Sequence, residues 1–292
     1  ALSFSIGLLV ANVTEGLLPT ITLSLAVGVR DLARRGAVVK RLSAVATLGA
    51  TSVICTDKTG TLTENRMRAV ALWTASGSTE IEAQPAAACP PDLARELAAT
   101  AFVCTSVDFG PGGAAVGDPT EVALADLADL TGVEVTIQDR DARRRLTYPF
   151  DPRLARMATV DDNGHGRLTV HVKGAPESVI PLCTRLAYSR SARPLTNLDR
   201  EVLTTQLESW AMRGLRVLAV ARRELTGAAP ASRSAAERNL TLLGLVAMVD
   251  PPRPEVREAV RKAHAAGIRG HVVAGDHPLT AAEIAHRVGI GT

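Results

Sequence analysis

The first 29 residues constrain the fold of this chain more than any other stretch. Ala1–Val29 is almost wholly apolar and carries a single charge, Glu15. About 20 consecutive apolar residues are enough to cross the hydrocarbon core of a bilayer as a helix. A buried helix in a soluble core is the alternative, but such helices rarely run this long with one charge. The stretch therefore predicts a transmembrane helix over residues 1–29.

The residues after this stretch are basic. Five cations follow it: Arg30, Arg34, Arg35, Lys40 and Arg41. Asp31 is the one acid in this segment. Positive charges that flank a membrane span mark its cytoplasmic end. We therefore expect the residues after about 30 to be cytoplasmic, with a helical stalk over 30–47. The first residue is not Met, no basic segment precedes the apolar stretch, and the last residues follow a predicted helix. We expect a fragment without a signal peptide.

The centre of the apolar stretch departs from a regular helix. The run NVTEGLLP over residues 12–19 combines an acid with Gly16 and Pro19, which weaken a helix locally. Backbone carbonyls freed inside a membrane must face protein or a polar cavity. A carboxylate in a membrane is costly and usually functional. We expect an unwound centre in which Glu15 binds a cation; pairing of Glu15 with a basic residue of another helix is the alternative.

Composition limits the remaining possibilities. The 292 residues are 46% hydrophobic and 3% aromatic, which allows about two domains with aliphatic cores. The net charge of +3 and the lack of a dense basic tract argue against nucleic acid as a partner. The four cysteines are scattered without a C-x-x-C pair, as expected for free thiols in a reducing compartment. We interpret His165, His171 and His264 as surface or packing residues.

Acidic residues end three predicted strands. The strands and the acids after them are 52–56 with Asp57, 242–249 with Asp250, and 268–274 with Gly275 and Asp276. A helix is expected between the last two strands, beginning at Pro254 and ending before Gly267. Alternation of strand and helix predicts a parallel sheet, and ligands bind at the carboxyl ends of such strands. Residues 69–245 would then be an inserted segment.

The loop after the first of these strands suits phosphoryl transfer. Asp57 opens the run DKTGT, and an exposed carboxylate at a strand end can attack a phosphoryl group to form an aspartyl-phosphate. Lys58 supplies positive charge, and the Thr59 and Thr61 hydroxyls can donate to phosphate oxygens. Gly60 lets backbone N–H groups approach the phosphate closely. Mg²⁺ would neutralise the developing charge. An ordinary polar turn after a strand is the alternative. It would explain Gly60 but not the full set of neighbouring residues suited to binding phosphate.

Several motifs together resemble those of the P-type ATPases, and most closely their type II cation-transporting group. DKTGTLT over 57–63 resembles the family's phosphorylation signature, and TEGL over 14–17 resembles the unwound centre of its fourth membrane helix. The order and spacing agree over about residues 11–289, nearly the whole chain. The further matching runs are GDPTE (117–121), KGAPE (173–177), DPPR (250–253) and AGDHP (274–278).

The resemblance implies an α/β fold. A haloacid-dehalogenase-like, Rossmann-type phosphorylation domain would contain an inserted α+β nucleotide-binding domain and follow a transmembrane helix. The implied bounds are 1–29 for the membrane helix with its unwound centre, 30–47 for the stalk, 48–68 and 246–292 for the phosphorylation domain, and 69–245 for the nucleotide-binding domain. The implied activity is ATP-driven cation transport through an aspartyl-phosphate. ATP and Mg²⁺ would be the cofactors, with the lipid bilayer and a cation (Ca²⁺, Na⁺, K⁺ or H⁺) as partners and the cell membrane as the location.

The resemblance also implies roles for residues of the phosphorylation loop and of the membrane helix. Asp57 would accept the phosphoryl group, with Lys58 beside it. Thr59 would help to hold the phosphate, and with Asp57 it would hold Mg²⁺. In the membrane, Glu15 would bind the transported cation together with backbone carbonyls near residues 12–13.

A larger set is implied to bind the nucleotide or its phosphates. Phe150 would stack on the base, and Arg216 would meet the phosphates. Taken as residues alone, Phe150 could instead be a core residue, and Lys173 and Arg216 could be solvated surface charges. The implied set is Thr61, Glu121, Phe150, Lys173, Gly174, Arg216, Asp250, Arg253, Gly275 and Asp276.

Three positions depart from the family pattern. Thr14 stands where the family usually has Pro, which would alter the unwinding and the cation selected. Ala155, in the run FDPRLARM over 150–157, stands where a Lys is expected. Arg156 would then substitute for it, or ATP affinity would fall. Ala274 stands where a Thr usually precedes Gly-Asp, which removes one phosphate donor.

The chain also lacks segments that the family carries, including a later magnesium-binding hinge, the actuator domain and further membrane helices. We therefore expect a partial pump that does not transport alone, with the missing remainder as a partner. Two alternatives stay open. A soluble haloacid-dehalogenase-type phosphatase would have no membrane span. A membrane-tethered nucleotide-binding module without turnover, a degenerate pump, is favoured by Ala155 and Ala274.

Overall fold

The computed structural model describes residues 2–81, 91–110, 114–189, 191–274 and 278–291. The chain divides into two compact units. The small unit comprises residues 1–55 and 261–271, and the large unit comprises residues 56–260 and 272–292. Gly275 and Asp276 lie outside the described residues, as does the side chain of Glu15, so their predicted roles stay predictions.

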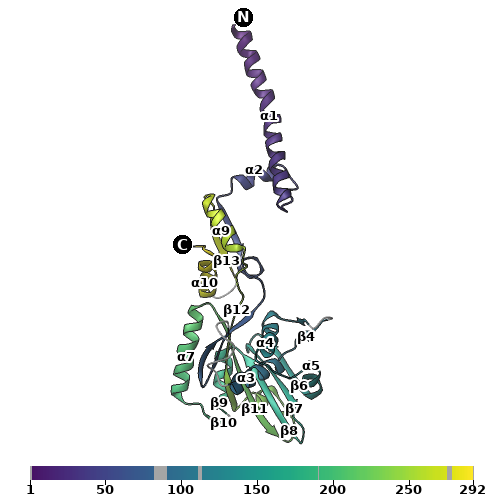
Figure 1. Cartoon of the computed structure of the whole chain (residues 1–292), viewed down its shortest axis with the longest axis vertical. Coiled ribbons are helices and arrows are strands. Elements are labelled where there is room, and N and C mark those ends of the chain that lie inside the picture. Colours follow the sequence, from purple (N-terminus) through teal and green to yellow (C-terminus); the bar gives the residue numbers. More distant parts are fainter. Residues whose placement is uncertain (1, 82–90, 111–113, 190, 275–277, 292) are drawn as a thin grey trace. The chain divides into compact units, whose positions relative to one another are not determined.

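Helix α1 (Leu2–Arg34) makes up half of the small unit (Figure 1). By length and composition, its part Gly16–Arg34 is suited to crossing a membrane. Leu17, Leu18 and Leu23 are exposed along it. Within the described part of the chain, α1 is therefore not the buried core helix that was the alternative.

The expected unwound centre of this helix is wrong. α1 is helical through both Gly16 and Pro19. The Thr20 hydroxyl donates to the Gly16 carbonyl at 2.7 Å, and the Thr22 hydroxyl donates to the Leu18 carbonyl at 2.8 Å. The helix therefore continues past Pro19, and one missing N–H does not end it here.

The stalk over 30–47 is not the single helical extension that the sequence predicts. Gly36 has φ +82°, and the Ala37 N–H donates to the Leu32 carbonyl at 2.9 Å, the pattern of a glycine-terminated helix. Helix α2 (Ser43–Gly49) then packs against α1. Strands β1 (Val53–Asp57) and β13 (Arg269–Val273) form a two-stranded sheet.

One nine-stranded sheet organises the large unit. Its order is β10-β9-β12-β11-β8-β7-β6, and β2 pairs with β12 and with β3. The bounds are β2 (Arg68–Thr74), β3 (Gly77–Glu80), β6 (Arg144–Asp151), β7 (Arg156–Asp162), β8 (Arg167–Gly174), β9 (Cys183–Tyr188), β10 (Ser191–Pro194), β11 (Arg216–Thr226) and β12 (Leu240–Val249). A separate hairpin pairs β4 (Asp108–Phe109) with β5 (Ala115–Val116).

Strand β12 corrects two expectations. The sequence places the run 242–249 in a parallel sheet with 52–56 and 268–274. β12 instead pairs antiparallel with β2 and β11 and parallel with β9. The expected domain boundary at residue 245 therefore falls inside one strand. The large sheet continues to Val249, because β12 keeps its partners to its last residue.

Helices cover both faces of this sheet. α3 (Pro91–Val103) and α4 (Pro119–Leu130) pack on one face, and α7 (Asn197–Met212) packs on the other (Figure 1). β12 alternates between the two cores, with Val246 on the first face and Leu245 on the second. The remaining helices are α5 (Ile137–Arg143), α6 (Pro176–Val179), α8 (Arg233–Ala236), α9 (Val256–Ala265) and α10 (Pro278–Val288). The chain is a mixed α/β protein, as predicted.

Candidate active site

A tight loop follows β1 and contains the residues expected to handle phosphate. The Thr63 N–H donates to the Lys58 carbonyl at 3.1 Å and closes the turn Lys58–Leu62. Gly60 has φ +75°, a conformation that favours glycine. The Asp57 carboxylate accepts a hydrogen bond from the Lys58 N–H at 2.7 Å, and Asp57 is exposed. The backbone therefore orients Asp57 while leaving it open to a reactant.

The segment after β12 holds this loop in place. Asp250 accepts hydrogen bonds through both carboxylate oxygens, from the Thr63 hydroxyl at 2.5 Å and from the Arg66 N–H at 3.1 Å. The Arg253 guanidinium donates to the Gly60 carbonyl at 3.0 Å. A hydrogen bond to a charged group contributes about 1.5–3 kcal/mol. Contacts between two distant parts of the sequence therefore fix the shape of the loop.

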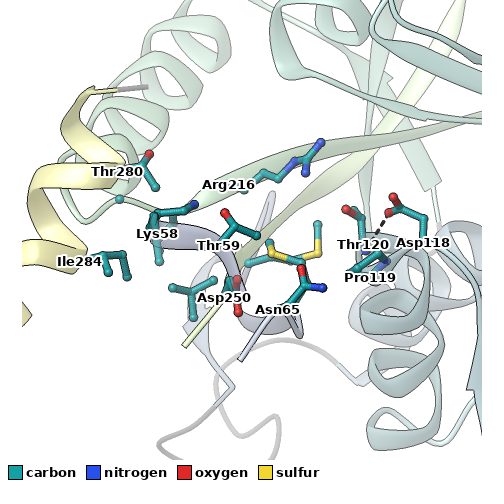
Figure 2. Close-up of a pocket in the computed structure, with 15 residues that line it drawn as sticks. Lys58, Thr59, Asn65, Asp118, Pro119, Thr120, Arg216, Asp250, Thr280 and Ile284 are labelled. Atoms are coloured by element: carbon teal, nitrogen blue, oxygen red, sulfur yellow. Dashed lines mark hydrogen bonds between the residues drawn. The ribbon is translucent and has the colours of Figure 1, made fainter. Parts of the chain in front are cut away.

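A cavity of about 630 Å³ opens beside the loop (Figure 2). Its volume lies within the usual range for small-molecule sites. The loop, the start of α4, the start of β11, the end of β12 and α10 all contribute to its lining. The labelled lining residues in Figure 2 are Lys58, Thr59, Asn65, Asp118, Pro119, Thr120, Arg216, Asp250, Thr280 and Ile284.

Lys58 is a buried cation at this cavity, with only 7% of its surface exposed. Burial lowers the pKa of Lys58, and the charge of Arg216 lowers it further. Asp250 and Asp57 act in the opposite direction, but the pKa stays below its ordinary value. The two carboxylates thus partly offset the cost of burying this ammonium group.

A second cavity, of about 250 Å³, lies beside Glu121 and Lys173. The Lys173 ammonium donates to one Glu121 carboxylate oxygen at 2.9 Å. Ser106 donates to the other oxygen through its hydroxyl at 2.6 Å and its N–H at 3.0 Å. Burial raises the pKa of Glu121, but Lys173 and Ser106 outweigh it and hold the pKa below its ordinary value. Glu121 is therefore an ionised acceptor in a buried setting.

Phe150 and Gly174 also line the second cavity. Phe150 is 56% exposed, so the core position that was its alternative is wrong. Lys173 is 5% exposed and paired, so it is not a solvated surface charge. A Cβ at Gly174 would lie 2.4 Å from the Arg156 Cβ and 2.5 Å from the Ala155 carbonyl oxygen. Only glycine lets β8 approach the turn before β7 so closely.

The two cavities adjoin, because Asp118, Thr120 and Arg216 line both. Asp118 caps α4 by accepting a hydrogen bond from the Thr120 N–H at 2.8 Å (Figure 2). Arg216 is exposed, and its guanidinium has no hydrogen-bond or ion-pair partner among the residues that the structure describes. A ligand with an aromatic ring at one end and anionic groups at the other fits this pair of cavities.

Most residues implied by the resemblance gather here. Lys58, Thr59, Arg216 and Asp250 line the larger cavity, and Glu121, Phe150, Lys173, Gly174 and Arg216 line the smaller one. Asp57 precedes the lining residues Lys58 and Thr59 in the chain. Thr61 is exposed and lines neither cavity, and Arg253 braces Gly60 instead of lining one.

Sequence reasoning missed several lining residues. Two of them, Asp118 and Thr120, flank a proline at the start of α4, where an Asp N-cap followed by Pro is a recognisable helix-start signal. Thr280 stands three residues before Glu283, the spacing of a capping box, but that pattern indicates a helix start and not a ligand site. Ser106 carries no such signal. Among the polar lining residues that were missed are Asn65, Ser106, Asp118, Thr120 and Thr280.

Arg156 does not take the place of a lysine at position 155. Its guanidinium donates to the Glu237 carboxylate at 2.7 Å and to the Ser178 hydroxyl at 2.8 Å, and it lines neither cavity. Sequence proximity suggested the substitution, but a buried carboxylate decides the direction of this side chain. Reduced ATP affinity at Ala155 stays a prediction.

A strand that ends in an acid, followed by a tight loop beside two adjoining cavities, is an arrangement suited to binding a phosphorylated ligand. A family profile described as P-type ATPase, cytoplasmic domain N, matches residues 93–255. The chain is 35% identical over 292 residues to calcium-transporting ATPase 1 of Lactococcus lactis, across 98% of this chain and 32% of the relative. It is 34% identical over 310 residues to the cation-transporting ATPase pma1 of Synechocystis, across 98% and 34%.

A third relative is the sodium/potassium-transporting ATPase subunit alpha of Hydra vulgaris, 35% identical over 315 residues, across 99% of this chain and 30% of the relative. The chain belongs to the P-type ATPase family. It spans about a third of the length of the curated relatives that it matches. Those relatives share similarity over nearly all of this chain, although the names of two of them specify different cations.

Proposed function

We propose that this chain is the ATP-using part of a cation-transporting P-type ATPase, in which Asp57 accepts the γ-phosphoryl group of ATP. The two adjoining cavities carry the proposal, because they connect a ring-sized site at Phe150 to the loop that begins after Asp57. The names of the relatives specify calcium in one case and sodium and potassium in another. The cargo proposed here is accordingly a metal cation or proton of unspecified identity.

At the smaller cavity the adenine ring would stack on Phe150. Stacked aromatic pairs contribute about 0.5–1.5 kcal/mol beyond the area they bury. The ionised Glu121 would accept a hydrogen bond from the exocyclic amine, with Lys173 and Ser106 holding the carboxylate in place. Gly174 keeps the floor of the cavity free of a side chain.

At the larger cavity the triphosphate would pass Arg216 and reach Lys58 and Thr59. An oxygen of the Asp57 carboxylate attacks the γ-phosphorus and forms a new P–O bond. The bond from that phosphorus to the β-phosphate oxygen breaks, and ADP leaves with the electron pair. An ionised carboxylate has no proton to lose, so no general base is needed. Gly275 and Asp276 are proposed neighbours of the same phosphoryl group.

The donor set around Asp57 suits Mg²⁺. The Asp57 carboxylate and the Thr59 oxygens are hard ligands, and Mg²⁺ usually binds through one or two carboxylates together with substrate phosphates and water. The residues that the structure describes contain no group of three or more His, Cys, Asp or Glu able to hold a metal ion. We propose a Mg²⁺ site in which the phosphates of the nucleotide supply the ligands that the protein does not. When bound, the ion neutralises charge on the transferring phosphoryl group.

We extend the proposal to the membrane and to the domain layout. The apolar length of α1 and the cations after it support a span of the cell membrane with later residues in the cytoplasm. Cation occupancy near Glu15 would be coupled to phosphorylation through residues 30–47. A haloacid-dehalogenase-like phosphorylation domain would comprise residues 48–67 and those after Val249, with the nucleotide-binding domain inserted between them.

Membranes that contain the full-length gene product provide the test. They are incubated with γ-labelled ATP and Mg²⁺, with calcium, sodium, potassium or no added cation in turn, and acid-stable, hydroxylamine-sensitive label is counted. Binding of ATP is measured in parallel by equilibrium dialysis. Label that requires one cation and is lost in Asp57→Asn, while ATP still binds, is the expected result. Label that persists in Asp57→Asn would overturn the assignment of the acceptor.

One alternative function is favoured by a specific observation. Ala155 leaves the smaller cavity without the expected lysine, and Arg156 is engaged with Glu237. Binding of ATP without label under any cation would therefore identify a nucleotide-binding module without turnover. Release of phosphate from small phosphoesters without any ATP binding would instead identify a phosphatase.

A further inference from the structure

Phe150 lies near the end of β6, just before the turn to β7, and this turn is held by one buried carboxylate, Glu237. The Glu237 side chain is 1% exposed. One of its oxygens accepts from the Arg156 Nε at 2.7 Å, and the other accepts from the Arg233 Nε at 2.7 Å. A buried carboxylate is costly unless it is paired. Two guanidinium groups therefore stabilise Glu237, and Glu237 in turn fixes their directions.

Both guanidinium groups are linked to the backbone of this turn. Arg233 donates to the Arg156 carbonyl at 2.6 Å and to the Pro149 carbonyl at 3.3 Å. Arg156 donates to the Ser178 hydroxyl at 2.8 Å, and that hydroxyl donates to the Leu154 carbonyl. Three carbonyls, located before, within and after the turn, are thus connected to a single carboxylate.

The turn needs this support because its backbone is strained. Ala155 has φ +48°, and this left-handed conformation is unfavourable for a non-glycine residue. The Ala155 carbonyl accepts a hydrogen bond from the Ala175 N–H at 2.8 Å, beside the close approach at Gly174. Packing alone does not fix the ring of Phe150, which is 56% exposed. The position of that ring therefore depends on the backbone that carries it.

We propose that Glu237 is a positioning residue for the base end of the nucleotide site. It acts through Arg156 and Arg233, which hold the backbone on both sides of Phe150 so that the ring is in place before the nucleotide arrives. Order established before binding reduces the entropy lost on binding. The inference rests on the proposed function, because it takes the smaller cavity as the site of the base. The larger cavity has other supports, chiefly Asp250.

The chain offers a matched control. Asp161 of β7 pairs with Arg144 of β6 at 2.6 Å, with side-chain exposures of 3% and 17%. Glu237 pairs with Arg156 at 2.7 Å, with exposures of 1% and 17%. Both ion pairs involve the β6–β7 hairpin, but Asp161 is paired at the end away from the turn. Asp161→Asn and Glu237→Gln thus remove the same charge from equally buried pairs.

The experiment measures dissociation constants of the full chain, in detergent micelles, for ATP and for tripolyphosphate by titration calorimetry. Glu237→Gln should bind ATP about tenfold more weakly, the size of a lost stacking contact, and bind tripolyphosphate like the wild type. Arg233→Lys keeps a charge beside Glu237 but cannot donate to both carbonyls, and it should show the same selective loss. Asp161→Asn should leave both constants unchanged.

Unchanged ATP affinity in Glu237→Gln would overturn the inference, as would an equal loss for ATP and tripolyphosphate. If Glu237→Gln does not fold, Arg233→Lys decides by the same criteria. A selective loss of ATP affinity in Asp161→Asn would also overturn it, because any damage to the hairpin would then suffice. Failure of the wild-type chain to bind ATP would refute the proposed function instead.

Discussion

His171 should make the stability of the large unit depend on pH. It lies in β8 with its side chain 11% exposed, and its Nε2 is 3.4 Å from the Asp161 Oδ2. Its Nδ1 is buried without a hydrogen-bond partner among the described residues. Burial lowers the pKa of His171 to about 3, with further lowering by Arg222 and Arg144. The folded protein therefore strongly disfavours the imidazolium form.

The sign of the effect follows from where the proton binds. The unfolded chain takes up the proton near pH 6.5 and the folded chain near pH 3, so acid favours unfolding across this window. Half of the unfolded-state histidine is already protonated at pH 6.5, and each further pH unit removes up to about 1.4 kcal/mol, so stability falls by about 2.3 kcal/mol between pH 6.5 and about 4.5. Burial raises the pKa of Asp161, with Arg144 opposing, so protonation of Asp161 offsets part of the loss at the acid end.

The assay uses the two tryptophans of the chain, Trp73 and Trp210, which are both buried in the large unit. Urea unfolding of the full chain in detergent is followed by their fluorescence across this pH range. Between the two pH values the wild type should lose about 2.3 kcal/mol more than His171→Gln. The exposed His165 serves as control, since His165→Gln should keep the wild-type slope. Parallel pH profiles for wild type and His171→Gln would refute the reasoning.

Three further substitutions test the site. Ala155→Lys should tighten ATP binding by about tenfold or more, because a charged hydrogen-bond donor is worth roughly 1.5–3 kcal/mol. Equal ATP affinity of the variant and the wild type in calorimetry would contradict the idea that the lack of a lysine at position 155 weakens ATP binding. Gly174→Ala should lose about 1–3 kcal/mol in urea unfolding, because the added Cβ meets Arg156 at 2.4 Å; wild-type stability would contradict the close approach. Thr63→Val removes a hydrogen-bond donor to Asp250, so the amount of phosphoenzyme label should fall while ATP affinity stays unchanged. Thr63→Ser, which keeps the hydroxyl, is the control. Full labelling in Thr63→Val would contradict a role of this hydrogen bond in holding the loop.

The position and shape of the loop after Asp57 could be predicted because their signals are local. A strand that ends in Asp57, a cation next to it and a glycine with positive φ at Gly60 are all read from adjacent residues. The pairing of Glu121 with Lys173 is different. These residues are 52 positions apart, and only the resemblance to a family placed them in one pocket.

The features that could not be predicted depend on long-range partners. The run 242–249 predicts a strand correctly, but nothing in it specifies β2 and β11 as its neighbours. Pro19 indicates a break in α1, yet the helix continues through it. The direction of Arg156 is decided by Glu237, 81 residues away, and no local pattern carries that information.

Among the cations of the site, Arg216 should contribute most to triphosphate binding. Arg253 is engaged with the Gly60 carbonyl, and Lys58 is buried beside two carboxylates. Arg216 is exposed and lines both cavities, and its guanidinium has no hydrogen-bond or ion-pair partner in the described part of the chain. A charged hydrogen bond to phosphate is worth roughly 1.5–3 kcal/mol.

Arg216→Met should therefore weaken ATP and tripolyphosphate alike, by about tenfold or more in titration calorimetry. This result would separate the two ends of the site, since Glu237→Gln is expected to weaken ATP alone. Loss of ATP affinity in Arg216→Met without any loss for tripolyphosphate would place Arg216 at the base instead. The junction of the two cavities would then not be where the phosphates pass.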